Sequence, residues 1–330
     1  MVDLKKMSEE ALMADLKQAA MVALRDCMAV SDGESVLILT DVHKRRIGAA
    51  MWECAKELGA EAMILEMIPR ESNGEEPPHA IAEIMKQVDV LLCPTTKSVS
   101  HTDARRAASK KGVRIATLPG ITEDMMIRTL NADYHRIAEV TIKLAEILTR
   151  AKTAHVTSPT GTDIILPIDG RAADPDTGLV HNKGDFSNLP AGEAYLAPVE
   201  DKSHGVIVID GAMAGLGMLQ DSHIRIKVEK GYAVEITGGK EAEELNKLVD
   251  QFGKPARNIA ELGIGTNFKA RITGNVLEDE KAVGTVHIAL GDNISMGGNV
   301  KVPSHLDGII KNPTVEVDGK VIMKNGELTI

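Results

Sequence analysis

The first 150 residues alternate short, continuously apolar runs with longer segments of helical periodicity. The apolar runs predict four strands, at residues 35–40, 60–66, 88–94 and 113–118. The periodic segments between them predict helices at residues 47–58, 77–87 and 101–111. Strands that are apolar throughout are typical of sheets buried on both faces, and helices between strands are typical of parallel crossovers. We therefore expect residues 1–150 to form a three-layer α/β domain with a mostly parallel sheet.

The pattern changes after a long predicted helix at residues 131–152. Short strands separated by turns follow, within 155–168 and at 205–210, 223–229, 232–236, 287–290, 300–305, 314–317 and 321–323. Lys230 and Gly231 alone separate two of these strands, which is a strong signal for a tight hairpin. A helix is predicted at 241–252. We expect residues 151–330 to form a second domain, mainly antiparallel β, that carries the functional site.

Charge and cysteine content exclude several classes of function. The chain of 330 residues has a formal net charge of −10, which argues against nucleic-acid binding, because that requires a basic surface. No stretch approaches the roughly 20 apolar residues that cross a bilayer, so we expect no membrane partner. The three cysteines show no C-x-x-C spacing, which indicates reduced, buried thiols in a cytoplasmic protein.

The turn after the first strand tests for a nucleotide-binding site. It reads TDVHKRRIGA from Thr40 and lacks both G-x-G-x-x-G and the P-loop pattern. Glycines in those motifs let the backbone approach a phosphate closely. Their absence argues against a dinucleotide cofactor.

His305 and Asp307 form the first candidate metal site. They lie two residues apart in VPSHLDGIIKN, which has the composition of an extended segment. Side chains at positions i and i+2 of a strand project from the same face. An imidazole and a carboxylate placed together can bind zinc, cobalt, manganese or ferrous iron. The alternative is a surface strand with two solvated polar residues.

Three further segments of the second half place a metal-ligand residue beside turn residues. They contain Glu193, Glu261 and His287. Each has a simple alternative role when taken alone. Glu193 follows Pro-Ala-Gly and could begin a helix, Glu261 could face solvent, and His287 lies among apolar residues as a buried core histidine would.

Taken in order, these four segments resemble peptidase family M29, the aminopeptidase T group of metalloaminopeptidases. The family's N-[LM]-P-x-x-E-x-x-x-A-P stretch is matched from Asn188 to Pro198 and includes Glu193. Its A-E-L segment is matched at Glu261, and its H-x-A-x-G segment at His287. The closing S-x-x-H-x-D motif is matched only in part, because the serine spacing before His305 differs. The resemblance covers most of residues 151–319.

The M29 resemblance implies a metal-dependent hydrolase, namely an aminopeptidase that acts on small peptides. It implies two divalent cations, zinc, cobalt or manganese, held by Glu193, Glu261, His287, His305 and Asp307. We expect Glu193 to bridge the ions, which would activate a water molecule and hold the substrate amine and carbonyl. The resemblance also implies a homodimer.

Other roles in such a hydrolase stay open at this point. The group that moves the proton is unassigned, with Glu200 and Glu280 as candidates because they lie near ligand segments. Arg171 could face a substrate carboxylate, or could serve the fold. The M29 family has a tyrosine seven residues past the ligand histidine, whereas this chain has Ile294 there.

The tail that begins at Gly291 is also similar to a second family, the 2,5-dihydroxypyridine dioxygenases. These enzymes use ferrous iron held by two histidines and one carboxylate. In that family a histidine replaces the glutamate at the Glu261 position, and the Glu193 and His287 ligands are lost. Because this chain keeps all three residues, the hydrolase is our main expectation and the dioxygenase the alternative. A third alternative is a metal-binding protein without catalytic activity.

Overall fold

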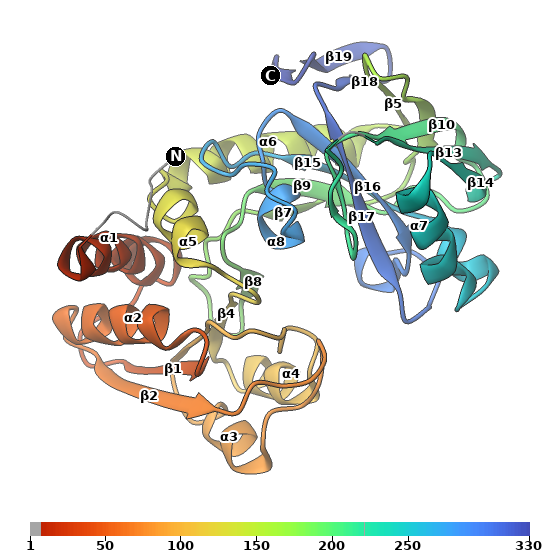
Figure 1. Ribbon diagram of the computed structural model, residues 1–330. Helices are drawn as coiled ribbons and strands as arrows, with labels where there is room; N and C mark the ends of the chain where they lie inside the picture. Colours follow the sequence, from red (N-terminus) through yellow and green to blue (C-terminus); the bar gives the residue numbers. More distant parts are fainter. Residues whose placement is uncertain (1–7, 221) are drawn as a thin grey trace. The chain divides into compact units, whose positions relative to one another are not determined.

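The computed structural model describes residues 8–220 and 222–330, which form two compact units (Figure 1). The first unit comprises residues 8–135 and 178–191, and the second comprises 136–177 and 192–330. The long predicted helix is present as α6 (Tyr134–Arg150). Most of it groups with the second unit rather than with the first 150 residues. Conversely, β8 (Phe186–Asn188) joins the first unit from beyond residue 150.

A five-stranded parallel sheet forms the centre of the first unit, with strand order β2-β1-β3-β4-β8. Its strands besides β8 are β1 (Ser35–Asp41), β2 (Glu61–Met67), β3 (Val90–Cys93) and β4 (Arg114–Thr117). The helices are α1 (Glu9–Val22), α2 (Arg45–Glu57), α3 (His79–Ile84), α4 (Asp103–Lys110) and α5 (Glu123–Thr129). In Figure 1, α1 and α2 lie on one face of the sheet, and α3 and α4 on the other. The predicted three-layer arrangement is therefore confirmed.

Burial in this sheet depends on strand position. Val36 and Leu37 of β1 point to opposite faces, and both are fully buried. The expectation that every strand would be buried on both faces is wrong for β2, where Met63 and Ile64 are 39% and 37% exposed. The reason is topological: β2 lies at the edge of the sheet, so it has a neighbour on one side only.

The second unit contains two antiparallel sheets. The eight-stranded sheet has the order β14-β13-β10-β6-β5-β18-β19-β20. Its strands are β5 (Thr153–Thr157), β6 (Asp163–Pro167), β10 (His204–Ile209), β13 (Ile224–Glu229), β14 (Tyr232–Thr237), β18 (Thr314–Val317), β19 (Lys320–Lys324) and β20 (Glu327–Leu328). The predicted hairpin at Lys230 and Gly231 joins β13 to β14. The helix predicted at 241–252 is α7 (Lys240–Asp250).

The seven-stranded sheet has the order β12-β11-β17-β16-β15-β9-β7. Its strands are β7 (Asp174–Asp176), β9 (Glu193–Leu196), β11 (Ala212–Met213), β12 (Gly217–Met218), β15 (Ile259–Gly265), β16 (Thr285–Gly291) and β17 (His305–Lys311). Three short helical segments lie next to the last three of these strands along the chain. They are η3 (Lys254–Arg257) before β15, α8 (Val276–Asp279) between β15 and β16, and η4 (Ile294–Met296) between β16 and β17.

One strand begins later than predicted. We expected a strand at residues 300–305, whereas β17 starts at His305. Pro303 has no N–H to donate to a ladder, and the Val302 N–H instead donates to the Asp292 carboxylate at 3.1 Å. Neither the Val302 nor the Pro303 nitrogen is therefore able to donate a hydrogen bond to the sheet, and the segment before His305 stays outside it.

The two sheets of the second unit share one apolar core. Leu262 and Ile264 of β15 join it together with Val286 of β16 and with Ile164 and Leu166 of β6. Because side chains alternate along a strand, the residues between these core positions project from the opposite face of the seven-stranded sheet. That opposite face carries the candidate metal centre.

Two further findings concern the chain as a whole. Cys27, Cys54 and Cys93 are buried and form no disulfide bond, as predicted. Across 8–220 and 222–330, none of the helices combines the length and apolar character that a membrane span requires.

Candidate metal centre

All five predicted ligands lie on one face of the seven-stranded sheet, on four adjacent strands. Glu193 is on β9, Glu261 on β15, His287 on β16, and His305 with Asp307 on β17. Figure 1 shows these strands side by side. The segments are far apart in sequence, and antiparallel pairing brings them together.

Small residues leave room for the ligands on this face. Each ligand lies opposite a glycine or alanine of the neighbouring strand: the register pairs are Glu193–Gly265, Glu261–Ala289, His287–Gly263, Asp307–Ala289 and His305–Gly291. Opposed side chains in an antiparallel pair are about 5 Å apart, so a larger partner would fill the space. The pattern of small residues therefore makes a hollow in which long polar side chains can converge.

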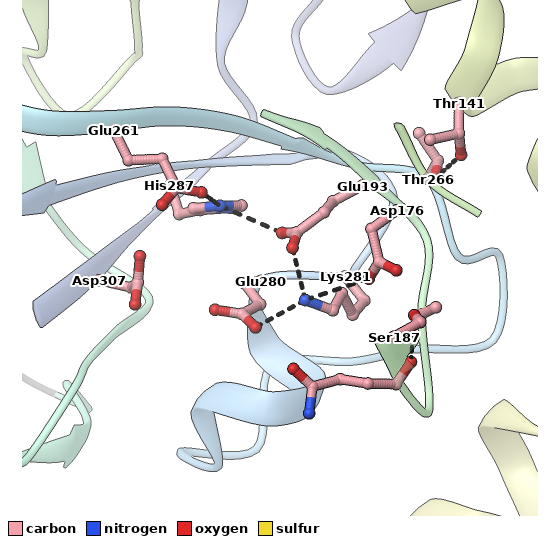
Figure 2. Close-up of polar contacts among 12 residues, drawn as sticks. Thr141, Asp176, Ser187, Glu193, Glu261, Thr266, Glu280, Lys281, His287 and Asp307 are labelled. Atoms are coloured by element: carbon pink, nitrogen blue, oxygen red, sulfur yellow. Dashed lines mark hydrogen bonds and ion pairs between the residues drawn. The ribbon is translucent and has the colours of Figure 1, made fainter. Parts of the chain in front are cut away.

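The ligand atoms are in direct contact. Glu261 lies between the two histidines, with Oε1 3.1 Å from His287 Nε2 and Oε2 3.1 Å from His305 Nε2. His305 Nε2 is also 3.4 Å from Asp307 Oδ1, and His287 Nε2 is 3.2 Å from Glu193 Oε2. Figure 2 shows Glu193, Glu261 and His287 joined in this way. The five side chains form one connected cluster.

Three overlapping groups in this cluster have the spacing of metal ligands. They are Glu193–Glu261–His287, Glu261–His305–Asp307 and Glu280–His287–Asp307, and within each group the ligand atoms lie within 4.8 Å of one another. Glu261 belongs to two of them, and so do His287 and Asp307. Each group offers one imidazole and two carboxylates, a set that suits a divalent first-row metal.

Lys281 is a buried cation in the same cluster, and no local pattern in the sequence indicates its burial. Its Nζ lies 2.6 Å from Glu193 Oε1, 2.6 Å from Glu280 Oε1 and 3.7 Å from Asp176 Oδ2 (Figure 2). Its side chain is only 3% exposed. In the sequence, the run Glu-Asp-Glu-Lys looks like a solvated turn. Only the tertiary structure reveals that this lysine and Asp176 face the ligands.

Electrostatic contacts between histidines and carboxylates dominate one half of the cluster. Burial opposes ionisation of Glu261, but hydrogen bonds from His287 and His305 outweigh it and hold the Glu261 pKa well below its usual range. Burial likewise lowers the pKa of His287, yet its contacts with Glu261 and Glu193 raise it to about 9. The pKa of His305 is raised for the same reason, through Asp307 and Glu261. Without metal, protonated imidazoles therefore provide the positive charge of the cluster.

The other half of the cluster is organised by Lys281. Burial raises the Glu193 pKa to about 8, while the nearby ammonium opposes that shift. Burial also raises the pKa of Glu280. The three surrounding carboxylates overcome the burial of Lys281 and raise its pKa. This arrangement keeps the lysine charged and leaves Glu280 able to hold a proton.

Two buried atoms in the cluster indicate a missing ligand. His287 Nδ1 is buried and forms no hydrogen bond among the described residues, and the buried Glu193 Oε2 has the 3.2 Å ion-pair contact with His287 Nε2 but no hydrogen bond. A buried polar atom without such a bond is costly, and a bound ion or water is a common explanation. The donor set and these atoms together fit a divalent metal.

The remaining residues named from the sequence lie in a different network. Arg171 contacts the Glu200 carboxylate and the Gly297 carbonyl. Glu200 also accepts hydrogen bonds from Asn293 Nδ2 at 2.9 Å and from a backbone N–H of the same loop. These contacts hold the loop that contains Ile294, whose side chain is 48% exposed. Arg171 and Glu200 thus stabilise a loop, and Glu280 is the proton-transfer candidate that lies in the cluster.

Replacing Gly263 by alanine should displace His287 and weaken metal binding. A Cβ at Gly263 would lie 1.9 Å from His287 Nε2, so the imidazole would have to move. We expect metal affinity to fall by about 10–100-fold, the range found when ligand orientation is lost. Metal titration of the purified variant measures this.

Gly308→Ala is a matched control for that experiment. Its Cβ would crowd Ile209 on the core side of β17, at 2.4 Å from Cδ1. This variant should lose stability and keep its metal affinity. Equal metal affinity in Gly263→Ala and the unmodified protein would contradict the assignment of His287 as a ligand.

Comparison with characterised proteins adds family information to this geometry. The family model for 2,5-dihydroxypyridine 5,6-dioxygenase matches residues 15–330. A 2,5-dihydroxypyridine 5,6-dioxygenase of Pseudomonas putida KT2440 is 27% identical over 251 residues, which cover 72% of this chain and 70% of that protein.

Two solved structures share the fold. The 2,5-dihydroxypyridine dioxygenase of Pseudomonas putida KT2440 superposes with a TM-score of 0.83 at 22% identity, covering 96% of this chain and 97% of the other. Wild-type AmpT from Thermus thermophilus superposes with a TM-score of 0.71 at 19% identity, covering 96% and 99%. The second likeness supports the M29-type fold expected from the sequence.

Proposed function

The chain belongs to the 2,5-dihydroxypyridine 5,6-dioxygenase family, and from this membership we propose that it is a metal-dependent dioxygenase that opens a hydroxylated pyridine ring. The family match over residues 15–330 is the observation that carries the proposal. The cluster on the seven-stranded sheet supports it by offering a metal site.

The expectation of a hydrolase is wrong. The family model and the relative from Pseudomonas putida both name a dioxygenase, which is an oxidoreductase and not an aminopeptidase. The expectation rested on Glu193, Glu261 and His287, which the M29 resemblance lists as ligands. A ligand set constrains which ion can bind, but it does not by itself determine which reaction the bound ion supports.

The family implies iron, and the group Glu261–His305–Asp307 is the proposed holder. We propose that these three residues take the place of the family's two-histidine, one-carboxylate triad, with Glu261 where we expected that family to have a histidine. The site therefore offers one imidazole and two carboxylates in place of two imidazoles and one carboxylate. Hard oxygen ligands of this kind suit ferrous or manganous ions. The chemistry that iron supplies when bound is the activation of dioxygen.

The chain's own residues supply orientation and proton handling. His305 Nδ1 lies 2.8 Å from the Asp292 carbonyl, a contact that orients the ring so that Nε2 faces Glu261 and Asp307. A carboxylate oxygen of Glu280 lies within 4.8 Å of the ligand atoms of His287 and Asp307. Because its pKa is raised, the Glu280 carboxyl can exchange a proton with a hydroxyl group of the substrate ring. Lys281 keeps Glu193 and Glu280 in place.

A second ion, which the sequence led us to expect, would be held by Glu193 and His287. The shared ligands of the three groups support this extension of the proposal. The metal-to-chain ratio of the purified protein, measured by elemental analysis, tests it. A ratio of one would reject the second ion and leave the dioxygenase proposal intact.

Oxygen uptake tests the proposed reaction. Metal-stripped protein loaded with ferrous iron should consume dioxygen in equal amount to the 2,5-dihydroxypyridine that it removes, with loss of the ring's ultraviolet absorbance. Protein loaded with zinc should consume none, because zinc has no redox chemistry. If the iron-loaded protein leaves a panel of hydroxylated pyridines untouched, the proposal fails.

A further inference from the structure

The edge strand β2 of the first unit presents apolar side chains to solvent (Figure 1). Met63 and Ile64, on opposite faces of the strand, are 39% and 37% exposed, and Ile68, just beyond its end, is 77% exposed. β1 is the single neighbour of β2 among the strands of residues 8–220 and 222–330. Edge strands are usually short, charged or covered, because a long apolar edge pairs readily with another strand. This edge is therefore suited to binding a further strand.

The backbone direction in β2 determines which groups such a strand would meet. The Glu61 N–H donates to the Glu34 carbonyl, just before β1, at 2.9 Å, so the odd-numbered residues of β2 turn their backbone groups toward β1. Because this direction alternates along a strand, the N–H and C=O groups of Ala62, Ile64 and Glu66 point away from the sheet. These three residues form the row that a partner strand can pair with.

Helix α2 adds an aromatic ring and two cations along the same edge. Trp52, the only tryptophan of the chain, donates from Nε1 to the Ala62 carbonyl at 3.0 Å. Lys56 Nζ lies 4.3 Å from the centre of the Trp52 ring. Toward the other end of β2, Arg45 donates to both oxygens of Glu66 at 2.6 Å. Tryptophan and arginine are enriched among the residues that carry binding energy at protein interfaces, so the composition of this edge is that of an interface.

From these observations we propose that β2 pairs with β2 of a second copy of this chain, antiparallel, about a two-fold axis at Ile64. The two Ile64 residues exchange both of their backbone hydrogen bonds, and Ala62 does the same with Glu66 of the second copy. The Ala62 carbonyl accepts this bond in addition to the one from Trp52, because a carbonyl oxygen has two lone pairs. The pairing joins the two five-stranded sheets into one and leaves no outward-facing residue of β2 unpaired.

Apolar side chains meet on both faces of this pairing. The two Ile64 side chains lie on the face that carries α2, because Glu66, two residues further on, contacts Arg45 of α2 there. On the opposite face, Met63 of each copy lies across from Leu65 of the other, at the distance of about 5 Å that opposed side chains have. Leu65 already packs against the apolar core of the first unit. The pairing therefore extends that core across the axis and covers the exposed residues.

Charges are complementary in the same register. Glu66 lies across from Ala62 of the second copy, at the end of the strand where Trp52 and Lys56 are placed. Each Glu66 is thus flanked by Arg45 of its own copy and by Lys56 of the other. One edge supplies both the anion and the cation that the contact needs, as a two-fold interface requires. This self-complementarity favours a second copy over a strand of another protein.

Sedimentation of the full chain in an analytical ultracentrifuge tests the proposal without metal or substrate. The unmodified protein should sediment as a dimer at micromolar concentration. Ile64→Lys should raise the dissociation constant more than about tenfold, because two like charges then oppose each other at the axis. Val234→Lys is the matched control. Val234 is 50% exposed on β14, the edge strand of the eight-stranded sheet, so this variant should remain dimeric.

A crosslink tests the position of the axis and keeps the proposal falsifiable if Ile64→Lys fails to fold. Ile64→Cys places two thiols within reach of a short bismaleimide, and a covalent dimer should form. Cys27, Cys54 and Cys93 are buried, so the unmodified protein and Val234→Cys should give none. A dimer that Ile64→Lys leaves intact, or a dimer of Ile64→Cys that does not crosslink, would overturn the proposal. A monomeric unmodified protein would also overturn it, and would leave the edge to a strand of another protein.

Discussion

His305→Ala should strongly weaken iron binding by the group Glu261–His305–Asp307 and leave the fold intact. The imidazole supplies a ligand atom of the group with Glu261 and Asp307 and is the histidine of that group. We expect affinity for ferrous iron to fall by more than about 100-fold, because even the loss of an orienting partner costs 10–100-fold. The His305 side chain is 30% exposed, so its removal opens no cavity in the core. Elemental analysis after dialysis, with circular dichroism, measures both effects.

His155→Ala is the matched control for this substitution. His155 lies in the same unit, pairs with Asp163 at 2.8 Å, and is 37% exposed. Its loss should leave metal content and oxygen uptake unchanged. Glu193→Ala provides a second comparison within the cluster, since a single ion at Glu261, His305 and Asp307 would survive it. Full metal content in His305→Ala would place the metal elsewhere.

Lys281→Met should destabilise the protein more than any surface substitution. It leaves the buried carboxylates of Glu193 and Glu280 without the ammonium that both contact at 2.6 Å. Breaking a buried ion pair by removing one partner costs about 3–5 kcal/mol. The free energy of unfolding from urea titrations, compared with that of the unmodified protein, measures this loss. Bound divalent metal should restore part of it, because the metal supplies the missing positive charge.

Two further variants test whether the loss of stability comes from the buried network around Lys281 or from the removal of any lysine charge. Lys227→Met removes a lysine from an exposed pair with Glu229 and should leave the unfolding midpoint unchanged. Adding Glu193→Gln to Lys281→Met removes one of the unpaired charges and should recover stability. A Lys281→Met protein as stable as the unmodified one would show that the lysine is not the cation of this cluster.

Local pattern was sufficient for most strands of the first unit. The apolar runs at residues 35–40 and 113–118 correspond to β1 and β4, because a buried strand must be apolar wherever it lies. The same reasoning failed for burial of β2. Its sequence is as apolar as that of a central strand, and only the strand order shows that it has one neighbour.

The candidate ligands could be named from the sequence, but their chemical setting could not. The order of the motifs pointed to Glu193, Glu261 and His287, and the structure places them together. Lys281 was missed because a lysine in a polar turn carries no sign of burial. The reaction class was misjudged because the presence of Glu193, Glu261 and His287 was taken to favour a hydrolase, whereas the family match over residues 15–330 places a chain with these residues among the dioxygenases.

The amino-acid sequence by itself determined which side chains share a face, since alternation along a strand is a local property of the backbone. It thereby placed His305 with Asp307. The tertiary structure alone decided that four strands distant in the chain become neighbours, with Lys281 buried between their carboxylates. Pairing register and burial depend on contacts between segments far apart in sequence, and no local pattern records them.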